Sequence, residues 1–193
     1  MERMLSNRRR YLTQDELGKL IKAARKGRYG RRDATLLLLM ARHGLRVTEA
    51  VDLRWDQIDF AKGHLYVRRL KGGIHSVHPI QGDELRNLRE LKREQDPESD
   101  FVFTSERKGP MTRSNVAKMI EATAARAGLA HCHPHQLRHT CGHLLAVARP
   151  YVPDPVRCFA EKYRIIRRRH RALSAISSLC GKSPPDRAQI LLN

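Results

Sequence analysis

Residues 32–50 read RDATLLLLMARHGLRVTEA, and this stretch decides how the rest of the chain folds. Apolar residues lie on nearly every side of a helix over residues 32–42, which predicts a helix buried among other elements. Gly44 follows and suits the left-handed conformation that ends many helices. A further helix is expected to begin after Arg46 and to run as far as Trp55. The stretch therefore predicts a buried helix, a tight turn and an arginine placed at that turn.

Recognisable signals flank this stretch on both sides. Thr13 and Glu16 have the spacing of a capping box, in which both side chains pair with free amides at the start of a helix. Residues 64–69 and 74–80 have the composition of strands, and the Lys71-Gly72-Gly73 segment between them predicts a β-hairpin turn. The remaining expected elements are helices over residues 83–94, 112–127 and 133–145, and a short buried strand over residues 101–103.

These elements predict a mainly α domain with one small antiparallel β-sheet, an α+β fold. We divide the chain into a basic N-terminal arm at residues 1–11, a folded domain at residues 12–146 and a tail at residues 147–193. The tail is rich in arginine and proline and has no amphipathic period, so we interpret it as an atypical, poorly ordered segment.

The balance of charge indicates a polyanionic partner. The 193 residues include 38 Lys and Arg against 20 Asp and Glu, which gives a formal net charge of +18. Clustered cations displace counterions from nucleic-acid phosphates, so double-stranded DNA is the leading candidate. A basic protein of the ribosomal type, or one whose charge serves only solubility, is the alternative.

Composition also narrows the cellular setting. The longest apolar stretch, residues 35–41, is far shorter than the roughly 20 residues needed to cross a bilayer, and the N-terminus lacks a signal-peptide core. The four cysteines show neither CxxC pairs nor a disulfide framework. We therefore expect a cytoplasmic protein without membrane contact, and we expect no cofactor.

Four side chains could carry chemistry on a phosphodiester. A metal-free enzyme needs permanently charged donors around the phosphate, and Arg46 and Arg138 could supply them. Lys71 could reach in from the hairpin as a general acid, and His135 is the other candidate for proton transfer, since imidazole as a group titrates near neutral pH. Each signal is weak alone, because an arginine near a helix end is most often a surface residue and a lysine beside Gly-Gly most often a turn residue.

Taken together and in order, these motifs resemble the tyrosine recombinase, or phage-integrase, family. The likeness rests on residues 44–50 (GLRVTEA), on Lys71-Gly72 and on residues 133–140 (HPHQLRHT), and residues 12–17 (LTQDEL) resemble the entry to that family's catalytic domain. It covers roughly residues 12–146. The chain is most similar to the short members that invert fimbrial switches and lack a separate N-terminal core-binding domain.

The resemblance implies a catalytic domain of the DNA breaking-rejoining type, which acts on DNA as a homo-oligomer. Arg46 and Arg138 would hold the scissile phosphate, Lys71 would protonate the leaving 5′ oxygen, His135 would assist proton transfer and Glu49 would support the site. In that family a tyrosine attacks the phosphate to form a 3′-phosphotyrosyl link, so that strands are exchanged without a metal or nucleotide energy.

The tail departs from the family pattern. Members continue after the HxxR helix with a segment ending in Leu-Gly-His and then carry the nucleophilic tyrosine, whereas the last tyrosines here are Tyr151 and Tyr163. We leave the nucleophile unassigned, with Tyr163 as a possible displaced one, and we hypothesise a frameshifted or degenerate tail. The chain would then be impaired in cleavage.

Two rival interpretations remain. Residues 131–135 (HCHPH), with Cys141 and His143 nearby, suggest zinc ligands, but structural zinc sites normally use paired ligands and Pro134 constrains this cluster. We therefore assign no metal. The other rival is a catalytically inactive DNA-binding remnant, which would keep the fold and could regulate an intact recombinase.

Overall fold

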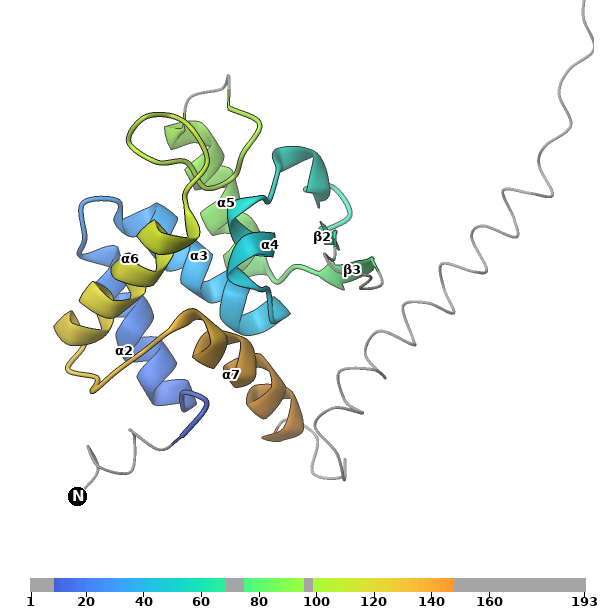
Figure 1. Cartoon of the computed structure of the whole chain (residues 1–193). Helices are drawn as coiled ribbons and strands as arrows, with labels where there is room; N and C mark the ends of the chain where they lie inside the picture. Colours follow the sequence, from blue (N-terminus) through green and yellow to red (C-terminus); the bar gives the residue numbers. More distant parts are fainter. Residues whose placement is uncertain (1–8, 69–74, 96–98, 148–193) are drawn as a thin grey trace, which may run out of the picture.

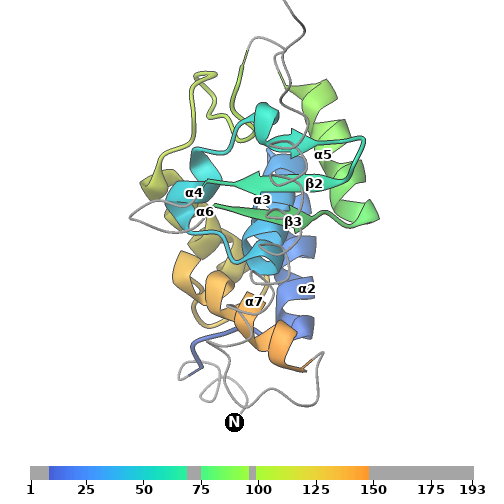
Figure 2. The ribbon, with the colours of Figure 1, turned by 90° about the vertical axis from the view of Figure 1, so that its right-hand side faces the viewer.

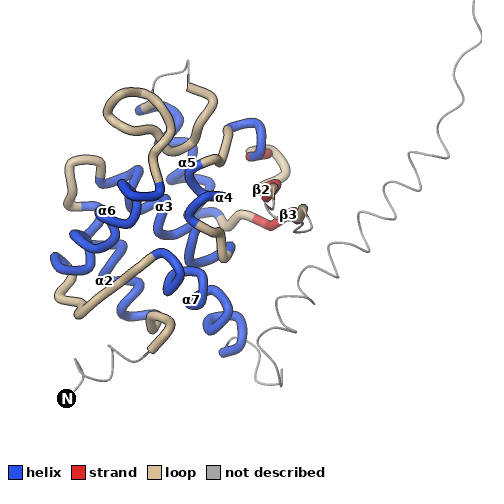
Figure 3. The backbone as a smooth tube through the Cα atoms, in the orientation of Figure 1, coloured by secondary structure: helices blue, strands red, loops and turns tan. Residues whose placement is uncertain are grey.

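The computed structural model describes residues 9–68, 75–95 and 99–147, and these form helices packed around one buried helix with a small sheet at the side (Figures 1 and 3). The helices are α2 (Gln14–Arg25), α3 (Gly30–His43), α4 (Val47–Val51), α5 (Gly82–Glu94), α6 (Arg113–Arg126) and α7 (Pro134–Val147). The sheet contains β1 (Ile58–Asp59), β2 (His64–Val67) and β3 (Ser76–Pro79). The predicted fold class, mainly α with a small antiparallel sheet, is confirmed.

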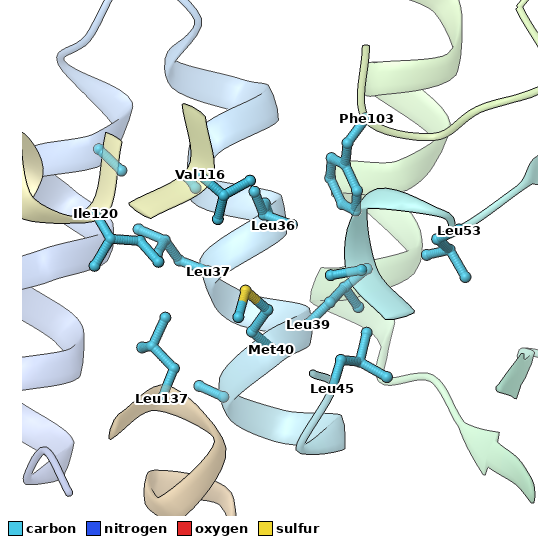
Figure 4. Close-up of a cluster of buried hydrophobic side chains, with 14 of the residues drawn as sticks. Leu36, Leu37, Leu39, Met40, Leu45, Leu53, Phe103, Val116, Ile120 and Leu137 are labelled. Atoms are coloured by element: carbon cyan, nitrogen blue, oxygen red, sulfur yellow. The ribbon is translucent and has the colours of Figure 1, made fainter. Parts of the chain in front are cut away.

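Helix α3 occupies the centre of the core, as its apolar sequence predicts. Every residue from 33 to 41 is buried, and α2, α4, α5 and α7 all pack against this helix. Figure 4 shows Leu37 and Met40 of α3 facing Ile120 of α6 and Leu137 of α7. A helix that contacts neighbours on most sides exposes little surface to water, which explains the leucine run.

The helix boundaries follow the capping signals. Thr13 accepts a hydrogen bond from the Glu16 backbone and the Glu16 carboxylate accepts one from the Thr13 backbone, so the predicted capping box opens α2. Gly44 ends α3 in the left-handed conformation, with φ 59° and ψ 39°. Gly128, with φ 70°, follows the end of α6. These helix ends could be predicted from one or two residues each, because helix caps are local interactions.

The sheet is an antiparallel meander in the order β1-β2-β3, seen in front of α3 in Figure 2. Leu65 of β2 pairs with Ile58 on one side and with His78 on the other. Leu65 and Val67 are buried, whereas Tyr66 between them is 37% exposed. The alternation places one face of the sheet against the core.

Two expected elements are wrong. The helix after Arg46 ends at Val51 rather than Trp55, because the chain turns to bury Leu53 and to pair residues 53–55 with residues 100–102. The expected strand at residues 101–103 forms only an isolated bridge, Arg54 with Phe101. The pairing partner is too short for a ladder, although Val102 and Phe103 are buried as predicted. The two-residue strand β1 was not predicted.

None of the helices in the described ranges is both long enough and apolar enough to span a membrane. The expected domain boundaries stay predictions, since most of the N-terminal arm and nearly all of the tail lie outside the described residues. The residues on both sides of the first boundary, Tyr11 and Leu12, pack on α7. The backbone amide of Leu12 donates to Thr140 Oγ1 over 2.9 Å, and the ring of Tyr11 stacks on that of His143.

We predict that Leu37→Ala destabilises the domain strongly. Leu37 is fully buried where α3, α6 and α7 meet, so the truncated side chain leaves a cavity and the free energy of unfolding should fall by about 2–5 kcal/mol. Urea unfolding followed by circular dichroism measures the change. Val147→Ala is the control, because Val147 is 68% exposed and such a change should stay within about 0.5 kcal/mol. A loss below about 1 kcal/mol for Leu37→Ala would contradict the central place of α3.

Candidate active site

Arg46 is held by Glu49 at the start of α4. The backbone amide of Arg46 donates to Glu49 Oε2 and its guanidinium Nη1 donates to Glu49 Oε1, both over 2.9 Å. The Glu49 side chain is only 1% exposed, whereas that of Arg46 is 42% exposed. A buried carboxylate thus fixes one edge of the guanidinium. The exposed remainder of this planar group keeps donors available for an anion.

Arg138 comes from α7 and meets the same turn. Its Nη1 donates to the carbonyl oxygen of Gly44 and lies 4.0 Å from Glu49 Oε2. The Arg138 side chain is 25% exposed. The structure therefore brings together two arginines that are 92 positions apart in the sequence, one on each side of the Glu49 carboxylate.

Sequence analysis missed the role of Gly44 in this arrangement. The left-handed conformation of Gly44 ends α3, and its carbonyl oxygen accepts the hydrogen bond from Arg138. The glycine signal predicted the turn correctly. That its carbonyl would meet α7 depends on tertiary packing, so no pattern in the sequence could have indicated it.

Contacts along its length fix α7 relative to this turn. At its start, the backbone amide of Gln136 donates to His133 Nδ1 over 3.3 Å, and Pro134 occupies the first helical position, where it lacks only an amide hydrogen that would be unpaired. Gln136 Nε2 donates to the carbonyl oxygen of Arg9 over 3.1 Å. Farther along, Cys141 Sγ lies 3.1 Å from the carbonyl oxygen of Arg42 in α3. Arg138 lies between these attachments, so its position is set by the packing of the whole helix.

His135 lies in the first turn of α7, three residues before Arg138, and its side chain is exposed. Its ring centroid is 6.5 Å from that of His133. Partial burial lowers the pKa of His133, and the neighbouring His131, His135 and His139 lower it further. The role of His135 in proton transfer stays a prediction.

Lys71 and Tyr163, the predicted general acid and the possible displaced nucleophile, lie outside the described residues. Their predicted roles are therefore untested by the structure. In the sequence Lys71 falls between β2 and β3, which pair through four residue pairs from His64↔Pro79 to Val67↔Ser76. The hairpin that the sequence predicted therefore has its two paired strands in the structure.

The histidine cluster does not assemble a metal site. Within residues 9–68, 75–95 and 99–147, His, Cys, Asp and Glu side chains form no group of three or more that could hold an ion. Cys132 is 2% exposed, and burial raises the pKa of its thiol to about 12.

Solved structures share this fold. The crystal structure of XerA recombinase matches with a TM-score of 0.62 and 27% identity, over 74% of this chain and 52% of that one. The catalytic core of lambda integrase matches with a TM-score of 0.60 over 72% of this chain and 85% of that one. At 22% identity this second likeness shows the fold alone. The chain spans about half the length of the solved XerA chain.

Sequence comparisons agree with the fold. The chain is 36% identical over 146 residues to the type 1 fimbriae regulatory protein FimE of Escherichia coli K12, covering 72% of this chain and 74% of FimE. FimB from the same strain is also 36% identical, covering 73% of each chain. The model of the phage integrase family matches residues 10–149, which include Arg46, Glu49 and Arg138. This protein therefore belongs to the phage integrase family of tyrosine recombinases.

Proposed function

We propose that this protein binds double-stranded DNA for site-specific recombination and holds one backbone phosphate between Arg46 and Arg138. The observation that carries the proposal is the convergence of both guanidinium groups on the buried Glu49 carboxylate. Guanidinium groups bind phosphate through two parallel hydrogen bonds, and two of them can surround the charge that grows on the phosphate oxygens during cleavage. The net charge of +18 supports binding to DNA along a longer surface.

Glu49 has a defined part in this proposal. Two cations placed side by side repel each other, and a carboxylate between them offsets that repulsion before DNA arrives. Because Glu49 is buried and Arg46 is not, the carboxylate holds the guanidinium without competing at its solvent side. The pair Arg46 and Arg138, here called the phosphate grip, is thus arranged before DNA binds. This reduces the free energy needed to order the two side chains on binding.

Related structures support DNA as the partner and a multimeric assembly as the working form. XerH was solved with its difH substrate, and lambda integrase was solved as a tetramer on a Holliday junction. We propose that this chain likewise acts on duplex DNA as a homo-oligomer. Lys71 would protonate the leaving 5′ oxygen and His135 would assist proton transfer, with no metal taking part.

The proposal includes impaired strand cleavage. A phosphate held by two arginines still needs an attacking hydroxyl, and after Arg138 the sequence contains only Tyr151 and Tyr163. Neither stands where the resemblance to the family implies the nucleophilic tyrosine. The chain would then keep its phosphate grip and act as a DNA-binding regulator that enters assemblies of an intact relative.

Removing either arginine should weaken DNA binding. For Arg46→Ala or Arg138→Ala we expect affinity for a fluorescent duplex to fall about tenfold, since a hydrogen-bonded charge contributes about 1.5 kcal/mol or more. Each change should also lower the slope of log affinity against log salt by about one. Fluorescence anisotropy between 50 and 200 mM salt measures both quantities.

Arg28→Ala is the matched control for these variants. Arg28 is exposed, pairs with Glu106 and precedes α3, whereas the proposed grip lies at the other end of that helix. Equal losses for Arg28→Ala and Arg138→Ala would show that only total charge matters. That outcome would contradict a phosphate grip at Glu49.

A nicked suicide substrate should yield no covalent protein–DNA adduct with this chain, although the same duplex is bound at low salt. XerH with difH serves as the positive control on the same denaturing gel. An adduct that disappears in Tyr163→Phe would contradict the proposed impairment and show a working recombinase. Failure to bind any duplex at low salt would contradict the proposed function as a whole.

A further inference from the structure

A chain of buried polar side chains lies next to the arginine turn. It runs from Ser76 and His78 of β3 through His43 of α3 to Glu84 of α5, and these residues are 7%, 1%, 3% and 0% exposed. Ser76 Oγ is 2.9 Å from His78 Nε2, the Nδ1 atoms of His78 and His43 are 3.3 Å apart, and His43 Nε2 is 3.1 Å from Glu84 Oε1. Three separate elements are thus joined through their side chains.

The acceptors in this chain fix the positions of its protons. The Glu84 carboxylate accepts a hydrogen bond from the backbone amide of Gln81 over 2.8 Å and lies 3.7 Å from Arg42 Nη1. As an acceptor on both oxygens, it takes its hydrogen bond to the ring from His43 Nε2–H. If both rings are neutral, His43 Nδ1 must accept from His78 Nδ1. His78 Nε2 then accepts the hydroxyl proton of Ser76.

The contact between the two rings needs one donor and one acceptor. Two N–H groups cannot face each other across the 3.3 Å between the Nδ1 atoms, so one of these nitrogens carries a proton and the other accepts it.

Other charged and titratable groups around the pair come from every neighbouring element. Arg42 of α3 donates to Asp83 of α5 over 2.6 Å, and this contact joins the two helices next to Glu84. On β2, the residue opposite His78 is the apolar Leu65, and His64 lies opposite Pro79. On α7, Cys141 approaches the carbonyl oxygen of Arg42. The imidazole pair contacts the Glu84 carboxylate through His43 Nε2.

His43 is covalently next to the proposed phosphate grip. It is the last residue of α3 and directly precedes Gly44, whose carbonyl oxygen accepts from Arg138. Two residues after Gly44, Arg46 opens α4. A shift of β3 that moves His43, and with it the end of α3, would therefore also move this turn.

We propose that His43 and His78 are positioning residues that lock β3 and α5 to the Gly44 turn and so set the geometry of Arg46 and Arg138. This inference rests on the proposed function for its effect on DNA. It also makes a prediction about the free protein, because the hydrogen-bond directions hold without DNA. Neither histidine contacts the phosphate itself.

The free protein provides the first test. Long-range 1H–15N spectra of the histidine rings should show His78 in the Nδ1–H form and His43 in the Nε2–H form at pH 8. Finding both rings in the Nε2–H form at pH 8, or a proton on both Nδ1 atoms, would overturn the proposed chain.

Substitutions of His78 test its link to the arginines. His78→Leu fills a similar volume without hydrogen bonds, whereas the amide of His78→Gln can donate to His43 and accept from Ser76. We expect His78→Leu to lower duplex affinity about fivefold and His78→Gln to restore most of it. In an Arg138→Ala background, His78→Leu should have little further effect, because it acts through the grip that is already lost.

His75→Gln is the matched control, since His75 is an exposed histidine that precedes β3 by one residue. Additive losses for His78→Leu and Arg138→Ala would overturn the positioning role. If wild-type protein binds no duplex, the proposed function fails. The inference is then tested separately, by the Nε–H signals of Arg46 and Arg138 in 1H–15N spectra of the free protein. His78→Leu must shift these signals and His75→Gln must not. If His78→Leu does not fold, Ser76→Ala takes its place.

Discussion

A buried carboxylate must be paired, and this requirement at Glu49 organises the site. Moving an unpaired carboxylate out of water costs several kcal/mol or more. Glu49 meets the requirement with the backbone and guanidinium of Arg46, while Arg138 lies 4.0 Å away. The same contacts that satisfy the carboxylate orient two cations toward one place. The contacts that pair the buried Glu49 carboxylate are therefore the same contacts that prepare Arg46 and Arg138 to bind an anion.

This arrangement depends on where α3 ends. Because α3 is buried from residue 33 to 41, its end cannot shift without disturbing several neighbouring helices. Gly44 then turns the chain at once, and this turn meets the imidazole chain on its N-terminal side and the arginine grip on its C-terminal side. The two polar clusters thus meet at this turn, where only Gly44 and Leu45 lie between His43 and Arg46. Neither could be built on a mobile loop without losing its hydrogen-bond geometry.

Features that depend only on neighbouring residues could be predicted from the sequence. The Thr13 capping box, the Gly44 turn and the buried character of α3 each follow from residues within one or two turns of helix. The helix expected to run to Trp55 and the strand expected at residues 101–103 were wrong. Pairing between residues 53–55 and 100–102 ends α4 early and leaves only a single bridge at Phe101, because this tertiary contact overrides local preference. Arg46 and Arg138 were selected as a pair through the order of motifs. The contact that joins them to Gly44 could come only from packing.

His43 and His78 were passed over because nothing in their neighbourhood marks them. Each lies in an apolar or alternating segment, and the sequence around a single histidine does not indicate which residue it will contact. Glu84 looked like an ordinary acidic residue near the start of α5. What makes the three a unit is burial, since at 3%, 1% and 0% exposure each polar atom must find its partner inside the protein. That requirement joins His43, His78 and Glu84 into one chain whose hydrogen bonds have a defined direction.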